Sequence, residues 1–264
     1  MKLPLVAFSL LFAFAAHAEP LKIGVVPGAY GDAVEVAAEE ARAQGFDVEP
    51  IEFSDWTTPN VALASGDIDL NFFQHVPFME NAEKQGGYHF HAVAPGILAN
   101  LGLYSLRHDS FDQIPDGGSV AIANDPVNQG RGLLLLQKAG LITLRDGVGF
   151  LGSLDDITAN PKHLKFTEVE GPQLVRITGD VDLAQGYPHF IVASGAFDPT
   201  GGLIYSGIED RQFAVNFVSR EDNKDDPRIA RFIALFQNSQ AVKDKVHASF
   251  ANSDKLYILA WEAK

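Results

Sequence analysis

Short apolar runs alternate with amphipathic segments over the first third of the chain. The run at residues 21–26 ends at Pro27-Gly28 and predicts a buried strand. Apolar side chains recur at helical spacing over residues 31–44, which predicts a helix. The same criteria predict a strand at 48–53, a short helix at 60–65 and a strand at 68–73. This order is typical of a parallel, doubly wound sheet, in which ligands bind beyond the carboxyl ends of the strands.

The pattern continues through two breaks that we interpret as crossings between lobes. The polar segment 110–118 is the first, and Gly201-Gly202 precedes the second. We therefore expect an α/β protein with lobe 1 at residues 19–105 and 205–264, and lobe 2 at residues 106–204. Two crossings leave a cleft between the lobes. The remaining predicted elements are helices at 77–84, 154–160 and 172–179, helices beginning at Pro126, Arg228 and Ser239, and strands at 89–93, 101–105, 119–123, 164–169, 181–184 and 213–218.

Composition and charge exclude several functions. The net charge is −14 at pH 7, which argues against nucleic acid or an anionic membrane surface as a partner. The chain contains no cysteine, so disulfides, thiolate nucleophiles and cysteine-based metal sites are excluded.

Residues 1–18 have the pattern of a secretory signal peptide. Lys2 supplies a positive start, an apolar region follows, and Ala16-His17-Ala18 is a small-x-small cleavage site. The mature chain is therefore expected to begin at Glu19. No cysteine follows the apolar region to carry a lipid anchor, and no later stretch is apolar enough to span a membrane. We expect a soluble, exported protein of the periplasm.

The segment 121–140 reads as a buried strand that leads into a helix. Asp125 can cap that helix and Pro126 suits its first position. Asn128 and Arg131 are three residues apart and share a face near the positive end of the helix dipole. This arrangement predicts a site for a carboxylate or a phosphate. The alternative is an ordinary helix whose exposed arginine pairs with a surface acid.

An aromatic group is predicted at the carboxyl ends of two strands. Phe73 and His75 leave one strand on the same side, and Phe78 returns near them after Pro77. Trp56 lies in a polar loop after the neighbouring strand. Such a pocket suits an apolar or thioether side chain, because sulfur packs favourably on aromatic rings. The alternative is that these rings only fill the core.

Metal binding and catalysis receive little support. His89-Phe90-His91 places two imidazoles on one strand face, but no third ligand follows at a convincing spacing for zinc. The chain lacks a Gly-x-Ser-x-Gly elbow, a P-loop and a dinucleotide fingerprint after the first strand. We therefore expect no catalytic residue, no metal and no cofactor.

Several motifs together resemble the NlpA/MetQ family of methionine-binding receptors of bacterial ABC importers. They are Phe53-Ser-Asp-Trp-Thr-Thr-Pro-Asn60, Ala62-Leu-Ala-Ser-Gly-Asp-Ile-Asp69, Asn71-Phe-Phe-Gln-His-Val-Pro-Phe78, Ala123-Asn-Asp-Pro-Val-Asn-Gln-Gly-Arg131, Leu133-Leu-Leu-Leu-Gln-Lys-Ala-Gly-Leu141 and Arg220-Glu-Asp-Asn223. The resemblance covers nearly all of the mature chain. It implies a type II periplasmic-binding-protein fold that closes on methionine and docks on an inner-membrane permease with its ATPase.

Carried over by position, the resemblance assigns roles to individual side chains. The thioether pocket of the family falls on Trp56, Phe73, His75 and Phe78, with Trp56 and Phe78 standing where the family usually has tyrosine. The carboxylate-binding arginine falls on Arg131 and its polar partner on Asn128.

Two further departures from the family pattern bear on function: the cysteine of a lipid anchor is missing, and Tyr187 replaces a head-group residue. Tyr187 stands where the family has an asparagine that contacts the amino-acid head group. A phenol lacks the two-sided pairing of an amide, so an ammonium group would need another acceptor or an aromatic face. The expected ligand is methionine of either hand, or a related small amino acid or carboxylate. The alternatives are a receptor of the same fold for another organic acid or nitrogen compound, and an exported enzyme with His75 as general base.

Overall fold

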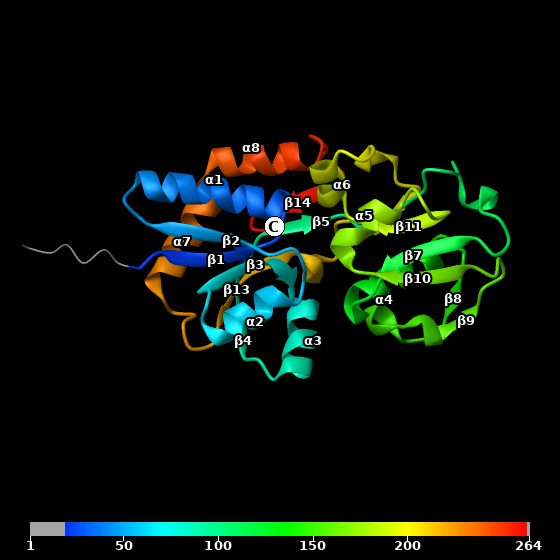
Figure 1. Cartoon of the computed structure of the whole chain (residues 1–264), viewed down its shortest axis with the longest axis horizontal. Helices are drawn as coiled ribbons and strands as arrows, with labels where there is room; N and C mark the ends of the chain where they lie inside the picture. Colours follow the sequence, from blue (N-terminus) through cyan, green and yellow to red (C-terminus); the bar gives the residue numbers. More distant parts are fainter. Residues whose placement is uncertain (1–18, 263–264) are drawn as a thin grey trace, which may run out of the picture.

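Two five-stranded sheets organise the chain into two lobes that lie side by side (Figure 1). The computed structural model describes residues 19–262. The predicted signal peptide, residues 1–18, lies outside this range. Within the range, no helix is long and apolar enough to cross a membrane.

The sheet of lobe 1 has the strand order β2-β1-β3-β13-β4. Helices α1 and α8 cover one face, and α2 and α3 lie on the other (Figure 1). β13 is antiparallel to both of its neighbours, whereas β1 is parallel to β2 and β3. The elements are β1 (Leu21–Val25), α1 (Ala29–Ala43), β2 (Val48–Glu52), α2 (Thr58–Ser65), β3 (Leu70–His75), α3 (Val76–Gly86), β4 (Phe90–Pro95), β13 (Val215–Arg220), α7 (Pro227–Asn238) and α8 (Gln240–Ser249), with a small sheet of β5 (Ile97–Ala99) and β14 (Tyr257–Leu259).

The sheet of lobe 2 has the order β10-β7-β11-β6-β12. Its parallel centre, formed by β10, β7 and β11, delivers the loops that reach the cleft. The elements are β6 (Gly102–Tyr104), β7 (Ser119–Ala123), α4 (Pro126–Lys138), β10 (Lys165–Val169), α5 (Leu174–Ile177), β11 (Leu183–Gly186), α6 (Pro188–Ser194) and β12 (Ile204–Tyr205), with a small sheet of β8 (Thr143–Leu144) and β9 (Ile157–Ala159).

The chain changes sheets at different places from those predicted. β6 and β12 both pair in the sheet of lobe 2, so the crossings lie between β5 and β6 and between β12 and β13. The predicted limits, after Ser105 and before Tyr205, were therefore wrong by a few residues. Strands of two or three residues carry no periodicity from which their sheet could be read. The predicted helix at 154–160 was also wrong, because Ile157–Ala159 pairs with β8 as a strand.

The two crossings are tied to each other. Leu101 and Ser206 exchange hydrogen bonds, with Ser206 N–H donating to Leu101 O at 2.8 Å and Leu101 N–H donating to Ser206 Oγ at 3.1 Å. The Asn100 side chain accepts from Ser206 Oγ and Gly207 N. Both connections therefore form one hydrogen-bonded hinge beside the cleft.

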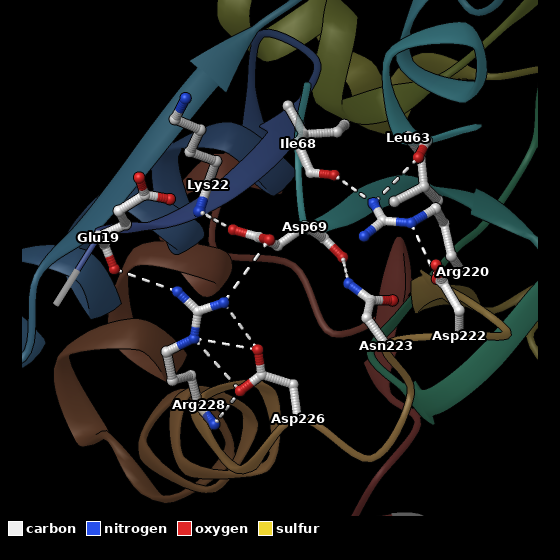
Figure 2. A network of polar contacts seen from close by, with 10 residues as sticks. All are labelled: Glu19, Lys22, Leu63, Ile68, Asp69, Arg220, Asp222, Asn223, Asp226 and Arg228. Carbon is white, nitrogen blue, oxygen red and sulfur yellow. Dashed lines mark hydrogen bonds and ion pairs between the residues drawn. The ribbon is translucent and has the colours of Figure 1, made fainter. Parts of the chain in front are cut away.

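The Arg220–Asn223 motif and its surroundings support the loop that precedes β3 (Figure 2). Arg220 Nη1 donates to the carbonyl oxygens of Leu63 at 3.1 Å and Ile68 at 2.9 Å. Asn223 Nδ2 donates to Asp69 O at 2.8 Å, and the Asp69 carboxylate accepts from Lys22 N. These bonds connect β13 to the start of the strand that carries Phe73 and His75. The motif therefore acts at a distance from the cleft, by fixing the register of β3.

Arg228 anchors the start of the described chain to the same network (Figure 2). Its guanidinium pairs with Asp226 at 2.7 Å and with Asp69 at 3.7 Å, and it donates to Glu19 O at 3.1 Å. Asp226 also caps α7, since its carboxylate accepts from Arg228 N. One arginine thus connects the first residue described, the β3 loop and a helix N-terminus.

Candidate ligand-binding site

A cavity between the lobes contains every side chain predicted for the site. Its empty space is about 480 Å³, including open solvent at its mouth. The predicted residues that line it are Trp56, Phe73, His75 and Phe78 from lobe 1, and Asn128, Arg131 and Tyr187 from lobe 2. The aromatic group was predicted from strand ends and the Asn128–Arg131 pair from helix spacing, whereas Tyr187 was placed at the site by the family resemblance. Their contact with a ligand stays a prediction.

β3 and α3 place His75 so that both of its ring nitrogens are engaged. β3 runs two residues further than predicted, and His75 ends it and caps α3. Its Nδ1 accepts from Phe78 N–H at 3.1 Å, so in the neutral ring the proton is on Nε2, which lies 3.3 Å from Asn128 Oδ1. Burial and the Arg131 charge lower the His75 pKa to about 3. His75 is therefore a neutral positioning group with no free lone pair for general-base work.

α4 begins as predicted, and its cap fixes the predicted anion-binding pair. Asp125 accepts from Asn128 N at 2.9 Å and from the Asn128 side-chain amide at 3.1 Å. The side-chain oxygen of Asn128, Oδ1, is thereby turned toward Arg131, whose Nη1 donates to it at 2.9 Å. The Arg131 guanidinium carbon also lies 4.2 Å from the ring centre of Phe213.

Arg131 is a buried cation without an acid. The residue is 9% exposed, and no carboxylate of residues 19–262 forms an ion pair with it. Burial lowers its pKa, but an arginine side chain keeps its charge in proteins. The alternative of an exposed arginine paired with a surface acid is wrong. The geometry instead leaves a positive charge that a ligand anion can neutralise.

The glycines beside Arg131 make room for the protein itself. A Cβ at Gly130 would lie 2.1 Å from Phe150 O, and one at Gly132 would lie 2.4 Å from Gln185 Oε1. The space at Gly130 is therefore taken by the backbone of a neighbouring segment. These glycines allow α4 to approach its neighbours closely enough to present Arg131.

Trp56 connects the two lobes through ring contacts. The centre of its ring lies 6.2 Å from the ring centre of Phe78 in lobe 1. In lobe 2, it lies 5.4 Å from the ring centre of Tyr187 and 6.2 Å from that of Phe190. A Cβ at Gly171 would lie 2.0 Å from Trp56 Cη2, so only glycine allows this approach. Phe73 completes the wall at 5.9 Å from Phe78. The rings are therefore not mere core of one lobe, because they form a wall shared by both.

Gln185 is a structural residue of the site that sequence reasoning missed. Its Oε1 accepts from Ala123 N at 3.0 Å, and its Nε2 donates to Asn128 O at 3.0 Å and to Tyr187 Oη at 3.1 Å. A single buried amide therefore joins β7, α4 and the residue after β11. A glutamine directly after a predicted buried strand was the available signal, because an amide buried there needs partners.

The segment that follows β11 begins a short helix, α6. Tyr187 occupies the position before the first residue of α6, and His189 is the second residue of that helix. Burial raises the pKa of the Tyr187 phenol, which stays neutral and accepts the Gln185 amide. His189, Tyr30 and Phe213 also line the cavity and were not predicted. Nothing in local spacing marks them, since three separate segments bring them together.

The cavity is positive in one place and otherwise neutral. No aspartate or glutamate is among the described residues that line it. Residues 19–262 contain no group of three or more His, Asp or Glu side chains that could hold a metal ion. The arrangement can therefore bind an anion at Arg131 and enclose an apolar group between the rings.

An anion site and an aromatic wall closed between two lobes define the class of two-lobed substrate-binding proteins. Comparisons with known proteins give the family. The chain matches the model of the NlpA lipoprotein family over residues 21–258, and it belongs to that family. Members serve as substrate-binding proteins of ABC transporters, so the role is binding and not catalysis, and the enzyme alternative is wrong.

Individual relatives support this assignment along most of the chain. The D-methionine-binding lipoprotein MetQ of Escherichia coli (strain K12) is 40% identical over 222 residues, covering 83% of this chain and 82% of its own length. The crystal structure of the methionine-binding protein MetQ has a TM-score of 0.81 at 39% identity, covering 88% of this chain and 95% of that one. A nutrient-binding protein from Burkholderia cenocepacia, solved bound to methionine, has a TM-score of 0.80 at 33% identity, covering 88% and 97%.

Proposed function

We propose that this protein binds methionine, or a closely related small amino acid, for an ABC importer. The observation that carries the proposal is Arg131, a buried cation in the cleft without an acid of its own. A ligand carboxylate there completes the charge balance and accepts a forked pair of hydrogen bonds. The relatives whose names record methionine binding add support.

The proposed side-chain pocket is the aromatic wall. Phe73, Phe78 and Trp56 enclose the apolar part of the ligand, and His75 holds Asn128 in place for Arg131. The ligand then touches both lobes at once. Because it contacts the closed arrangement more extensively than an open one, its binding favours closure.

We further propose that the protein is exported, works in the periplasm without a lipid anchor, and delivers its ligand to an inner-membrane permease. The signal-peptide pattern of residues 1–18 supports this location, and the family role supports the partner. Fractionation of cells that produce the full chain tests it. A processed form beginning at Glu19 in the osmotic-shock fluid is expected, and an unprocessed cytoplasmic form would contradict it.

A thermal-shift screen of residues 19–264 against L- and D-amino acids and small organic acids tests the ligand. A ligand at a hundred times its dissociation constant stabilises the fold by about 2.7 kcal/mol, which raises Tm by several degrees. A response to methionine supports the proposal. A response to other acids alone would replace methionine as the ligand.

The second candidate is a receptor of the same fold for another organic acid or nitrogen compound, and Tyr187 favours it. The family resemblance implies an amide at the position of this phenol, and the phenol oxygen already accepts from Gln185. Substituting Tyr187→Asn tests whether this residue excludes methionine. A gain in methionine affinity supports that interpretation, and an unchanged affinity argues against it.

A further inference from the structure

His189 is a buried imidazole with no hydrogen bond. The residue is 2% exposed, and neither Nδ1 nor Nε2 has a partner. An unsatisfied buried donor or acceptor costs about 1–3 kcal/mol, so such groups are rare in native proteins. A phenylalanine or leucine would fill the same space without this cost. This unsatisfied imidazole therefore indicates a functional role for His189.

The ring of His189 belongs to the cleft and not to the interior of lobe 2. It lines the same cavity as Arg131, and its centre lies 4.6 Å from that of Tyr30 in lobe 1 and 6.0 Å from that of Tyr187. Burial lowers the His189 pKa to about 3, so the ring is neutral and keeps one lone pair and one N–H.

Two other acceptors of the cavity, on Asn128 and Tyr187, are already engaged. Asn128 Oδ1 accepts from Arg131 and lies beside His75 Nε2. Tyr187 Oη accepts from Gln185. The His189 ring therefore offers the cavity an acceptor that no residue of 19–262 uses. The Tyr30 ring beside it adds an aromatic face, which attracts a cation.

We propose that His189 is a specificity-determining residue that accepts a hydrogen bond from the amino group of the ligand, while Arg131 holds the carboxylate. The inference rests on the proposed function and deepens it. Tyr187 lacks the two-sided pairing of an amide. His189, two residues further along the chain, is therefore assigned the contact with the amino group. The ligand class is then an α-amino acid, and carboxylates without an amino group bind more weakly.

A ligand series combined with two variants tests this assignment. Isothermal titration calorimetry compares L- and D-methionine with 2-hydroxy-4-(methylthio)butanoate and 4-(methylthio)butanoate, which carry a hydroxyl or a hydrogen in place of the amino group. The wild type is expected to prefer methionine to 4-(methylthio)butanoate by about 10-fold or more, the value of one charge-assisted hydrogen bond. His189→Leu is expected to lose that preference, and His189→Gln, which retains an acceptor, to keep part of it.

Binding of 4-(methylthio)butanoate controls for folding, because this acid does not use His189. It is expected to bind the His189→Leu variant as well as the wild type. An unchanged preference for methionine in His189→Leu would overturn the inference and leave the proposed function intact. Binding of none of the four compounds by the wild type would overturn the proposed function, and this inference with it.

Discussion

Substituting Arg131→Met separates the stability of the fold from the affinity of the site. The guanidinium is buried beside Asn128 and the ring of Phe213, with no ion pair to any residue of 19–262. A buried charge without a counter-ion costs several kcal/mol. The methionine side chain introduced at position 131 replaces the apolar stem of the arginine. Asn128 Oδ1 still accepts a hydrogen bond from His75 Nε2–H, so no buried acceptor loses its last partner. We expect the ligand-free variant to be more stable than the wild type by about 1 kcal/mol or more.

The same substitution should remove ligand binding. Truncating one partner of a buried, hydrogen-bonded charge pair costs about 2–5 kcal/mol, or roughly 30-fold to 5,000-fold in dissociation constant. Urea denaturation of the ligand-free protein measures the first effect, and calorimetric titration with L- and D-methionine measures the second. The two results must have opposite signs for the reasoning to hold.

Arg228→Met is the matched control. Arg228 is also partly buried, but it pairs with Asp226 and donates to Glu19 O, so its removal is expected to destabilise the protein by about 1 kcal/mol and leave ligand affinity unchanged. A ligand-free Arg131→Met protein that is less stable than the wild type would refute the view that Arg131 is an uncompensated charge. Unchanged affinity in that variant would refute its role as the carboxylate anchor.

Three further predictions concern closure, the buried amide and pH. Gly171→Ala should weaken ligand binding by about 10-fold or more without touching the ligand, because the new Cβ lies 2.0 Å from Trp56 Cη2 and opposes closure of the lobes. Calorimetric titration measures the affinity, and a value equal to that of the wild type would contradict this prediction. Gln185→Leu should lower the free energy of unfolding by about 2–4 kcal/mol in urea, since it leaves buried backbone groups unpaired, and a loss below 0.5 kcal/mol would argue against the amide's role. The pKa values of His75 and His189 fall from 6.5 to about 3 on folding, so their stabilising effect is complete above pH 6.5 and is lost as the pH falls toward 3. Each histidine should lower the free energy of unfolding by about 2–3 kcal/mol between pH 7 and pH 4.5. In urea denaturation, the free energy of unfolding of His189→Leu should therefore fall less steeply with decreasing pH than that of the wild type. Equal slopes would contradict this prediction.

Local patterns predicted the parts of the site that local chemistry determines. The cap at Asp125 and the three-residue spacing of Asn128 and Arg131 are properties of one helix, and the structure shows them as expected. The alternation that brought Phe73 and His75 to one side of a strand is likewise local. These features survive in the fold because no distant segment has to agree with them.

The features that were missed depend on pairing between distant segments. β6 and β12 are too short for any period, and their sheet is decided by partners about a hundred residues apart along the chain. The contacts of Gln185 and His189 are determined only when β11 lies beside β7 and α6 faces α1. The glutamine and the histidine were visible in the sequence, but their burial and the atoms beside them were not.

The position of Trp56 gives the protein an optical property. The chain has two tryptophans, and the other, Trp261, lies against Phe236 and donates to Gln237 O, both within lobe 1. Trp56 packs against lobe 2 only when the lobes are together. Separation of the lobes exposes its indole to water and shifts its emission to longer wavelength, while Trp261 supplies a constant background. Intrinsic fluorescence of the unlabelled protein, with Trp261→Phe to remove that background, is therefore expected to report the proposed opening and closing.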